Sequence, residues 1–155
     1  MNFIADGMLG KLSKWLRILG YDVSYSATLN DAELARIARM EDRILLTRDT
    51  QLVKRKGLKS VLSRSDQPEE QLRQLVDELD LRVDVDSFTR CLVCNTLLVD
   101  VEAQAVASQV PAYVLATQAH FRCCPTCARV YWRGTHWQRM RDRLGALSSR
   151  RVPNA

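Results

Sequence analysis

The chain has 155 residues, 46% of them hydrophobic, which is enough for one α/β core with a small appendage but not for two full domains. Lys and Arg outnumber Asp and Glu by 23 to 18, and eight arginines face the single acid Asp142 between Arg122 and Arg151, which indicates an anionic partner such as nucleic acid, or a solvated basic tail. No segment approaches the roughly 20 apolar residues that span a bilayer.

The first 80 residues alternate four times between a short apolar strand and a helical pattern. The expected strands are residues 3–6, 21–26, 43–47 and 59–63, and the expected helices are residues 8–19, 30–42 and 67–79, with a short helix beginning at Asp49. Asn30 followed by Glu33 is typical of a capping box, and Gly20 stands where the first helix would end. The alternation predicts a three-layer domain with a parallel sheet over residues 1–80.

From Leu81 the pattern changes to short β-like pieces around the cysteines, and a basic helix is expected from Trp137. We expect residues 81–145 to form a second, smaller module and residues 146–155 to form a disordered tail. Residues 100–119 are expected to leave this module as an excursion between its two cysteine pairs.

Four aspartates follow the four expected strands: Asp6, Asp31, Asp49 and Asp66. Because crossovers between parallel strands are right-handed, the carboxyl ends of the strands meet at one edge of the sheet. Asp22 precedes its strand and is excluded. Like charges 4 Å apart repel by about 4 kcal/mol at an effective dielectric of 20, so the group requires a cation, and Mg²⁺ or Mn²⁺ suits oxygen ligands. Each aspartate taken alone could instead cap a helix or occupy its first turn.

The cysteines form two C-x-x-C pairs. Cys91 and Cys94 make the first, and Cys124 and Cys127 the second, although Cys123 could replace Cys124. Two such pairs can present four thiolates in a tetrahedron, which predicts a structural Zn²⁺ with no open position for water, rather than disulfides or unpaired thiols.

The cellular location of the protein affects whether its cysteines are expected to form disulfides or to bind a metal. Asp6 and Lys11 interrupt the first apolar patches and argue against a secretory signal. We therefore expect a cytoplasmic protein, in which disulfides are disfavoured and clustered cysteines hold a metal.

Several cations are candidates for contacts with a nucleic-acid backbone. They are Lys11, Lys14, Arg17, Arg48, Arg129 and Arg133. The first three would lie on the polar side of the first helix, which could equally be a solvated face. Beside the last two, Tyr131 and Trp132 are expected to form core of the cysteine module rather than to stack on bases.

The stretches "FIADGMLGKLSKWLRILGYD", "ILLTRD", "CLVCN" and "CPTCARVYWRGTHW" resemble the Mut-seven C-terminal ribonuclease family over residues 2–140. The resemblance implies a PIN-like nuclease fold with a zinc ribbon near the C-terminus. It also implies that the acidic site falls on Asp6, Asp31 and Asp49, with Asp66 as a further candidate, and that "CPTC" rather than Cys123 supplies the second pair of zinc ligands.

The expected function is metal-dependent hydrolysis of RNA phosphodiester bonds. Carboxylate-bound ions can activate a water and neutralise charge on the phosphate, so no His or Cys nucleophile is required. The chain has two histidines, His120 and His136, and both lie far along the sequence from the acidic edge, which argues against a histidine-based ribonuclease. The alternative is a non-catalytic RNA-binding or adaptor protein on the same fold.

Overall fold

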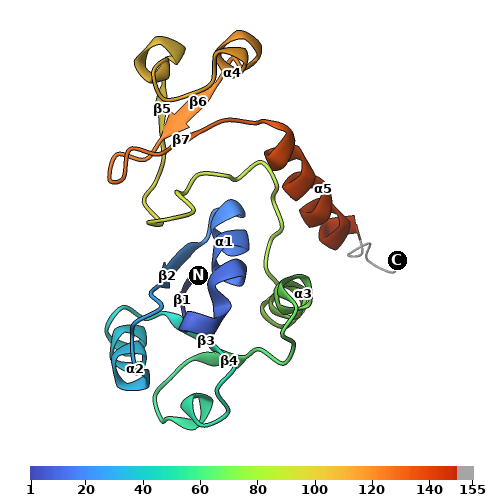
Figure 1. Cartoon of the computed structure of the whole chain (residues 1–155). Coiled ribbons are helices and arrows are strands. Elements are labelled where there is room, and N and C mark those ends of the chain that lie inside the picture. The colour runs from blue at the N-terminus through green and yellow to red at the C-terminus, as the bar shows by residue number, and fades with distance from the viewer. Residues whose placement is uncertain (150–155) are drawn as a thin grey trace. The chain divides into compact units, whose positions relative to one another are not determined.

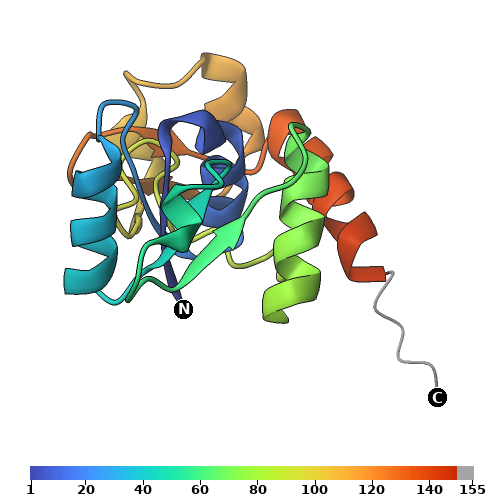
Figure 2. The ribbon, with the colours of Figure 1, turned by 90° about the horizontal axis from the view of Figure 1, so that it is seen from below.

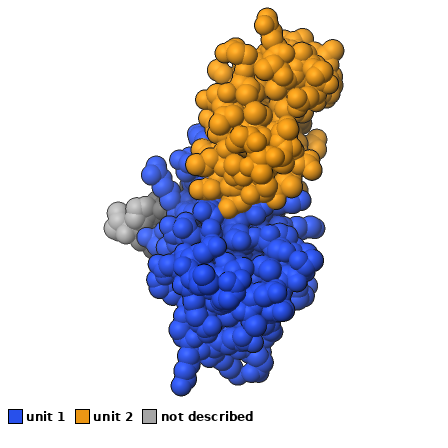
Figure 3. Space-filling model, turned by 90° about the vertical axis from the view of Figure 1, so that its left-hand side faces the viewer, with its two compact units in different colours: residues 1–88 blue, residues 89–155 orange. Residues whose placement is uncertain are grey.

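The computed structural model describes residues 1–149, and the chain divides into two compact units, residues 1–88 and the residues from Thr89 on. Figure 3 shows the two units in different colours. Each is described here by itself.

The first unit is an α/β domain around a parallel sheet of four strands in the order β2-β1-β3-β4 (Figure 1). Its strands are β1 (Asn2–Ala5), β2 (Asp22–Tyr25), β3 (Ile44–Thr47) and β4 (Ser60–Leu62). Its helices are α1 (Gly10–Ile18), α2 (Asp31–Met40) and α3 (Pro68–Leu79), with short 3-10 turns at η1 (Gly7–Leu9) and η2 (Leu52–Lys54). The predicted parallel α/β sheet is confirmed.

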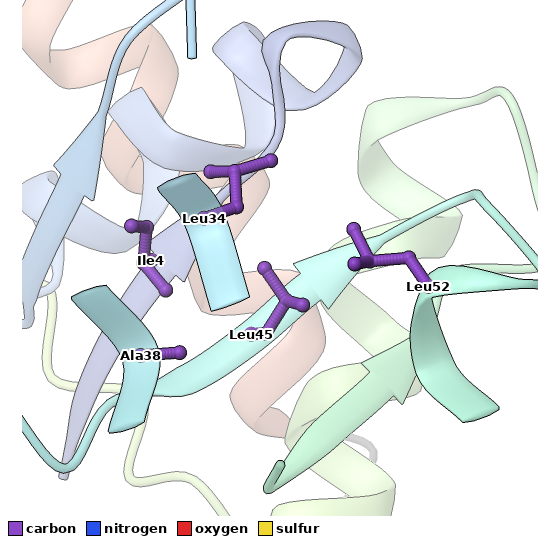
Figure 4. Packing of buried hydrophobic residues seen from close by; sticks show 5 residues of the cluster. All are labelled: Ile4, Leu34, Ala38, Leu45 and Leu52. Atoms are coloured by element: carbon purple, nitrogen blue, oxygen red, sulfur yellow. The ribbon is translucent and has the colours of Figure 1, made fainter. Parts of the chain in front are cut away.

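One face of this sheet is covered by α2. The buried cluster there comprises Ile4, Leu34, Ala38, Leu45 and Leu52, and Figure 4 shows their side chains pointing toward one another between α2 and the strands. Leu34 and Ala38 are one helical turn apart, so they share the inner face of α2. Each large side chain buried here contributes about 1.5–3 kcal/mol. Because α2 follows β2, this packing fixes the helix N-terminus at the carboxyl edge of the sheet.

The opposite face is covered by α1 and α3, which pack against each other. Figure 2 shows α2 and α3 on opposite sides of the strands. Successive side chains of a strand point to opposite faces of the sheet, so Ile4 of β1 points to one face and Phe3 and Ala5 point to the other. All three are fully buried because both faces are covered.

The expected capping box of α2 is present. The Asn30 side chain accepts a hydrogen bond from the Glu33 amide at 2.9 Å, and the Glu33 carboxylate accepts one from the Asn30 amide at 3.0 Å. These bonds satisfy donors that the first helical turn leaves unpaired.

The second unit is built on an antiparallel sheet in the order β5-β6-β7. Its strands are β5 (Val99–Val101), β6 (Phe121–Cys123) and β7 (Val130–Tyr131), and its helices are η3 (Ala103–Val106), α4 (Ala112–Thr117) and α5 (Thr135–Ser149). The expected excursion at 100–119 thus carries β5, η3 and α4. It supplies Val106, Val110 and Val114 to a buried cluster with Phe121, which gives this unit a core of its own.

Helix α5 begins two residues before the expected start at Trp137 and runs to Ser149. Residues 146–149, expected to belong to a disordered tail, are therefore helical, and Leu147 is 8% exposed. The rest of the expected tail, residues 150–155, lies outside the described residues. Within residues 1–149, no helix is long and apolar enough to cross a membrane.

Candidate functional site

Asp6 stands at the carboxyl end of β1, and its side chain is held by three donors. Its amide continues the sheet by donating to the Leu46 carbonyl at 3.0 Å. Oδ1 accepts from the Met8 amide at 2.9 Å, and Oδ2 accepts from the Thr47 hydroxyl and, at 3.3 Å, from the Arg48 amide. The residue is 9% exposed. A carboxylate at this depth with three donors has one fixed orientation.

Thr47 connects this carboxylate to Asp49. The side chain of Thr47, the last residue of β3, is fully buried, and its hydroxyl accepts a hydrogen bond from the Asp49 amide at 3.0 Å while donating to Asp6. Asp49 Oδ1 in turn accepts from the amides of Gln51 at 2.7 Å and Leu52 at 3.2 Å. The sequence predicted that a short helix begins at Asp49, and this prediction is wrong. The Asp49 carboxylate instead closes the turn that precedes η2.

The other two candidate acids lie at the same edge but are exposed. Asp31 is the first residue of α2, where Asn30 supplies the cap. Asp66 follows β4 and accepts a hydrogen bond from Nε2 of Gln67 at 3.2 Å. Among residues 1–149, no group of three or more carboxylates has ligand atoms close enough to share an ion. The structure links the Asp6 carboxylate to the backbone of Asp49 through Thr47, and a metal site formed by any of the four aspartates stays a prediction.

Two glycines let the loop after Asp6 pack closely against the loop after β2. A Cβ on Gly7 would lie 3.2 Å from the Ala27 carbonyl oxygen, and one on Gly10 would lie 2.9 Å from the Tyr25 hydroxyl. That hydroxyl donates to the Gly7 carbonyl at 2.9 Å. The contacts leave no room for larger side chains, so they hold the loop that carries Asp6 in place.

The candidate cations of the first unit differ in exposure. Lys11 and Lys14 are exposed on α1, as expected. The expectation for Arg17 is wrong: it is 4% exposed, and its Nε and Nη2 donate to the Val23 carbonyl at 3.1 and 2.7 Å. Because α1 packs on both the sheet and α3, its buried stripe is wide enough to include Arg17. Arg48 is half-buried beside Asp6.

Four cysteines of the second unit converge on one point. The sulfurs of Cys91, Cys94, Cys124 and Cys127 all lie within 4.8 Å of one another. Each pair is formed by the same tight turn: the Asn95 amide donates to the Cys91 carbonyl and the Ala128 amide to the Cys124 carbonyl, both at 2.9 Å. Cys123 lies in β6, outside this group.

The spacing of the sulfurs fits a tetrahedral ion. Zn–S bonds of about 2.3 Å at tetrahedral angles require sulfur atoms about 3.8 Å apart. The Cys91–Cys127 and Cys94–Cys124 sulfurs are 3.6 and 3.2 Å apart. The set therefore matches Zn²⁺ in ligand type, number and arrangement.

The four thiols differ in the direction in which their surroundings shift the pKa. Burial by itself would raise the pKa of Cys91, but hydrogen bonds from the Tyr131 hydroxyl and nearby amides bring it below its ordinary value, and the pKa values of Cys94 and Cys124 are lowered too. An amide of the next turn lowers the pKa of Cys127, but loss of water and the other thiols outweigh it and raise the pKa to about 11. A divalent ion bound to the cluster would favour the thiolate form of all four cysteines, because metal ligands must be deprotonated.

The two rings beside the second pair, expected to form core, are half-buried. The Tyr131 hydroxyl lies 3.1 Å from the Cys91 sulfur and accepts a hydrogen bond from the Leu92 amide at 3.2 Å. Trp132 packs against the cluster around Phe121.

The candidate cations of this unit, Arg129 and Arg133, are exposed. The Arg133 guanidinium lies over the Trp137 ring, 4.7 Å from its centroid. Such a contact orients a cation without neutralising it, so Arg133 keeps its charge for an anionic partner.

A family model described as Mut7-C RNAse domain matches residues 1–144, which include the acidic edge and all four clustered cysteines. No curated protein matches the chain, and neither does any solved structure.

Proposed function

The chain belongs to the Mut7-C RNAse domain family, and from this membership and the acidic edge we propose that it is a metal-dependent ribonuclease that hydrolyses RNA phosphodiester bonds. The proposed site comprises Asp6, Asp31 and Asp49, with Asp66 at its border. The single observation that carries the proposal is the Asp6–Thr47–Asp49 network, because Thr47 ties the Asp6 carboxylate to the backbone of Asp49, whose own carboxylate is held by two amides.

The carboxylates retain capacity for a metal. An ionised carboxylate offers about four acceptor positions; Asp6 uses three and Asp49 two for the hydrogen bonds described above. The remaining oxygen lone pairs are hard ligands of the kind that Mg²⁺ and Mn²⁺ take. Bound ions of this kind would lower the pKa of a water and neutralise charge on the attacked phosphate.

The protein's own side chains would then position the substrate. Asp6 and Asp49 orient the reacting centre because their carboxylates are held by backbone amides and Thr47. Lys11 and Lys14 extend from α1 as mobile cations that can meet phosphates. His120 and His136 belong to the second unit and have no assigned role.

We propose a structural role for Zn²⁺ in the second unit. Four thiolates fill a tetrahedral shell, so no position is left for a water or a substrate. The ion would fix the two knuckles and β7, and with them Arg129 and Arg133, which can bind the RNA backbone.

The proposal is tested by RNA cleavage in Mn²⁺ or Mg²⁺ with the Asp6→Asn and Asp49→Asn variants. Both should remain folded and lose metal-dependent cleavage, whereas Asp77→Asn, an exposed change on α3, should keep it. Cleavage that persists in both variants would refute the acidic site. RNA binding without cleavage, and without a Mn²⁺-induced rise in melting temperature that Asp6→Asn removes, would instead support a non-catalytic RNA-binding protein.

A further inference from the structure

Two polar side-chain atoms at the carboxyl edge of the sheet are buried without a hydrogen-bond partner. Nε of Arg48 and Oγ of Ser63 are shielded from solvent, and neither has a hydrogen-bond partner among the described residues; Nε of Arg73, on α3, shares this state. Native proteins leave few buried polar groups unpaired because each is destabilising, so such a group calls for a specific explanation.

Arg48 and Ser63 are neighbours across the sheet. In the pairing of β3 with β4, Thr47 lies opposite Leu62, so each of the two residues is the first one past its strand. The Ser63 amide donates to the Thr47 carbonyl at 2.7 Å, which continues the sheet to this level. Adjacent strands are about 4.8 Å apart. The two residues therefore occupy neighbouring positions at the edge of the sheet, with Ser63 at 7% exposure.

The backbone of Arg48 lies beside Asp6, a residue of the proposed catalytic site. The Arg48 amide lies 3.3 Å from Oδ2 of Asp6. No described residue forms an ion pair or a side-chain hydrogen bond with the Arg48 guanidinium, so its positive charge has no counter-charge among the described residues. A half-buried guanidinium without a counter-charge favours an anion.

We propose that Arg48 and Ser63 form a phosphate subsite, which holds the RNA phosphate next to the one that is cleaved. The inference rests on the proposed ribonuclease function. Phosphate oxygens accept the forked hydrogen bonds that a guanidinium donates, and the Ser63 hydroxyl supplies a further donor. One bound phosphate thus satisfies both unpaired groups and aligns the strand at the acidic edge.

The most direct test is a nuclear magnetic resonance titration that follows the Nε–Hε signal of Arg48 without added Mg²⁺ or Mn²⁺. Inorganic phosphate and a short single-stranded RNA should both shift this signal, and the RNA should do so at the lower concentration. A shift with phosphate but not with RNA would identify a site for free phosphate. No shift with either would overturn the subsite.

Variants separate the roles of charge and hydroxyl. Arg48→Gln should weaken RNA binding roughly tenfold or more and reduce the slope of log affinity against log salt by about 0.7, the value for one phosphate contact on a single strand. Ser63→Ala should weaken binding about three- to tenfold and leave the slope unchanged, because it removes no charge. Arg64→Gln is the matched control, since Arg64 is exposed next to Ser63 and paired with Glu78 at 2.7 Å; it should change neither quantity.

The stability of Ser63→Ala provides a second readout. Removing an unpaired buried hydroxyl should leave the melting temperature without ligand unchanged or higher. A lower melting temperature with unchanged RNA affinity would show that a buried water satisfies Ser63, and would refute the subsite.

Failure of the subsite and failure of the ribonuclease function are distinguishable. If Asp6→Asn abolishes cleavage while Arg48→Gln leaves RNA affinity and its salt slope unchanged, the subsite alone is wrong. If the Arg48 signal shifts as expected but Asp6→Asn still cleaves, the ribonuclease assignment fails and an anion site remains.

Discussion

At the scale of single residues, the Thr47 hydroxyl connects the two segments that carry Asp6 and Asp49. It donates to the Asp6 carboxylate and accepts from the Asp49 amide, so one side chain links the end of β1 to the backbone that carries Asp49. The sequence contains a signal for this role of Thr47. Thr47 is two residues from Leu45, so both side chains point to the same face of an otherwise apolar strand, and a polar group buried there requires a partner.

Removing this hydroxyl should damage both stability and activity. Thr47→Val keeps the side-chain shape but leaves the Asp49 amide without its acceptor, so the free energy of unfolding should fall by about 1–3 kcal/mol and RNA cleavage should drop. Thr47→Ser should restore most of both. Urea denaturation and cleavage assays measure the two effects, with the exposed Thr50→Val as control; a Thr47→Val variant with unchanged stability would argue against the network.

A second residue-scale prediction concerns Ala128. It follows Cys127 with a φ of 63°, as Asn95 follows Cys94 with a φ of 67°. This left-handed conformation is unfavourable for alanine by roughly 1–2 kcal/mol, whereas asparagine tolerates it. Ala128→Gly should therefore tighten zinc binding.

Competition with a zinc chelator measures this effect. The same substitution at Ala116, an exposed position in α4, should instead destabilise by up to about 1 kcal/mol. Equal or weaker zinc binding by Ala128→Gly would show that the turn is not strained.

At the scale of elements, periodicity predicted most of the first unit, because alternating strands and helices leave a local signature. It predicted the four strands, the capping box at Asn30 and the parallel direction of the strands. Arg17 was misplaced because the width of a buried helical stripe depends on how many neighbours the helix has, which local sequence does not record. The helices in residues 100–119 were missed for a related reason: they are short and are stabilised by packing on Phe121.

The candidate site was predictable only in part. Strand ends located Asp6 and Asp49 because the topology of a parallel sheet brings them to one edge, and the C-x-x-C spacing located the four cysteines. The partners that orient these groups, Thr47 for the acids and Tyr131 for Cys91, depend on contacts between distant segments, so spacing alone does not reveal them.

The packing of α2 on the sheet gives an element-scale prediction. Leu45 is fully buried in the cluster with Leu34 and Ala38, so Leu45→Ala should lower the free energy of unfolding by about 2–5 kcal/mol. Met40 lies on α2 but is 73% exposed. Met40→Ala should therefore change the free energy of unfolding by less than about 0.5 kcal/mol. Chemical denaturation of both variants checks the assignment, and similar losses would mean that α2 does not pack as described.

At the scale of the whole molecule, the two units depend on different sources of stability. The first has a parallel sheet with a helix layer on each face, while the second has three short strands and a small apolar cluster. Structural zinc in such modules is worth roughly 10 kcal/mol or more, so the second unit should depend on its ion.

Zinc removal should therefore act on one unit alone. After chelation, amide hydrogen exchange should accelerate strongly in β5, β6 and β7 and remain slow in β1 and β3. Cys91→Ser and Cys127→Ser should reproduce this pattern, and Cys123→Ser should not, because its sulfur lies outside the cluster. Uniform loss of protection across both units would contradict the separate dependence on zinc.

The central claim, a divalent metal at the acidic edge, is tested most directly by anomalous diffraction from crystals soaked in Mn²⁺. The account predicts a manganese peak at ligand distance, about 2.2 Å, from carboxylate oxygens of both Asp6 and Asp49, and its disappearance in Asp6→Asn crystals. A protein that cleaves RNA in Mn²⁺ but shows no peak at this edge, or keeps the peak in Asp6→Asn, would contradict it.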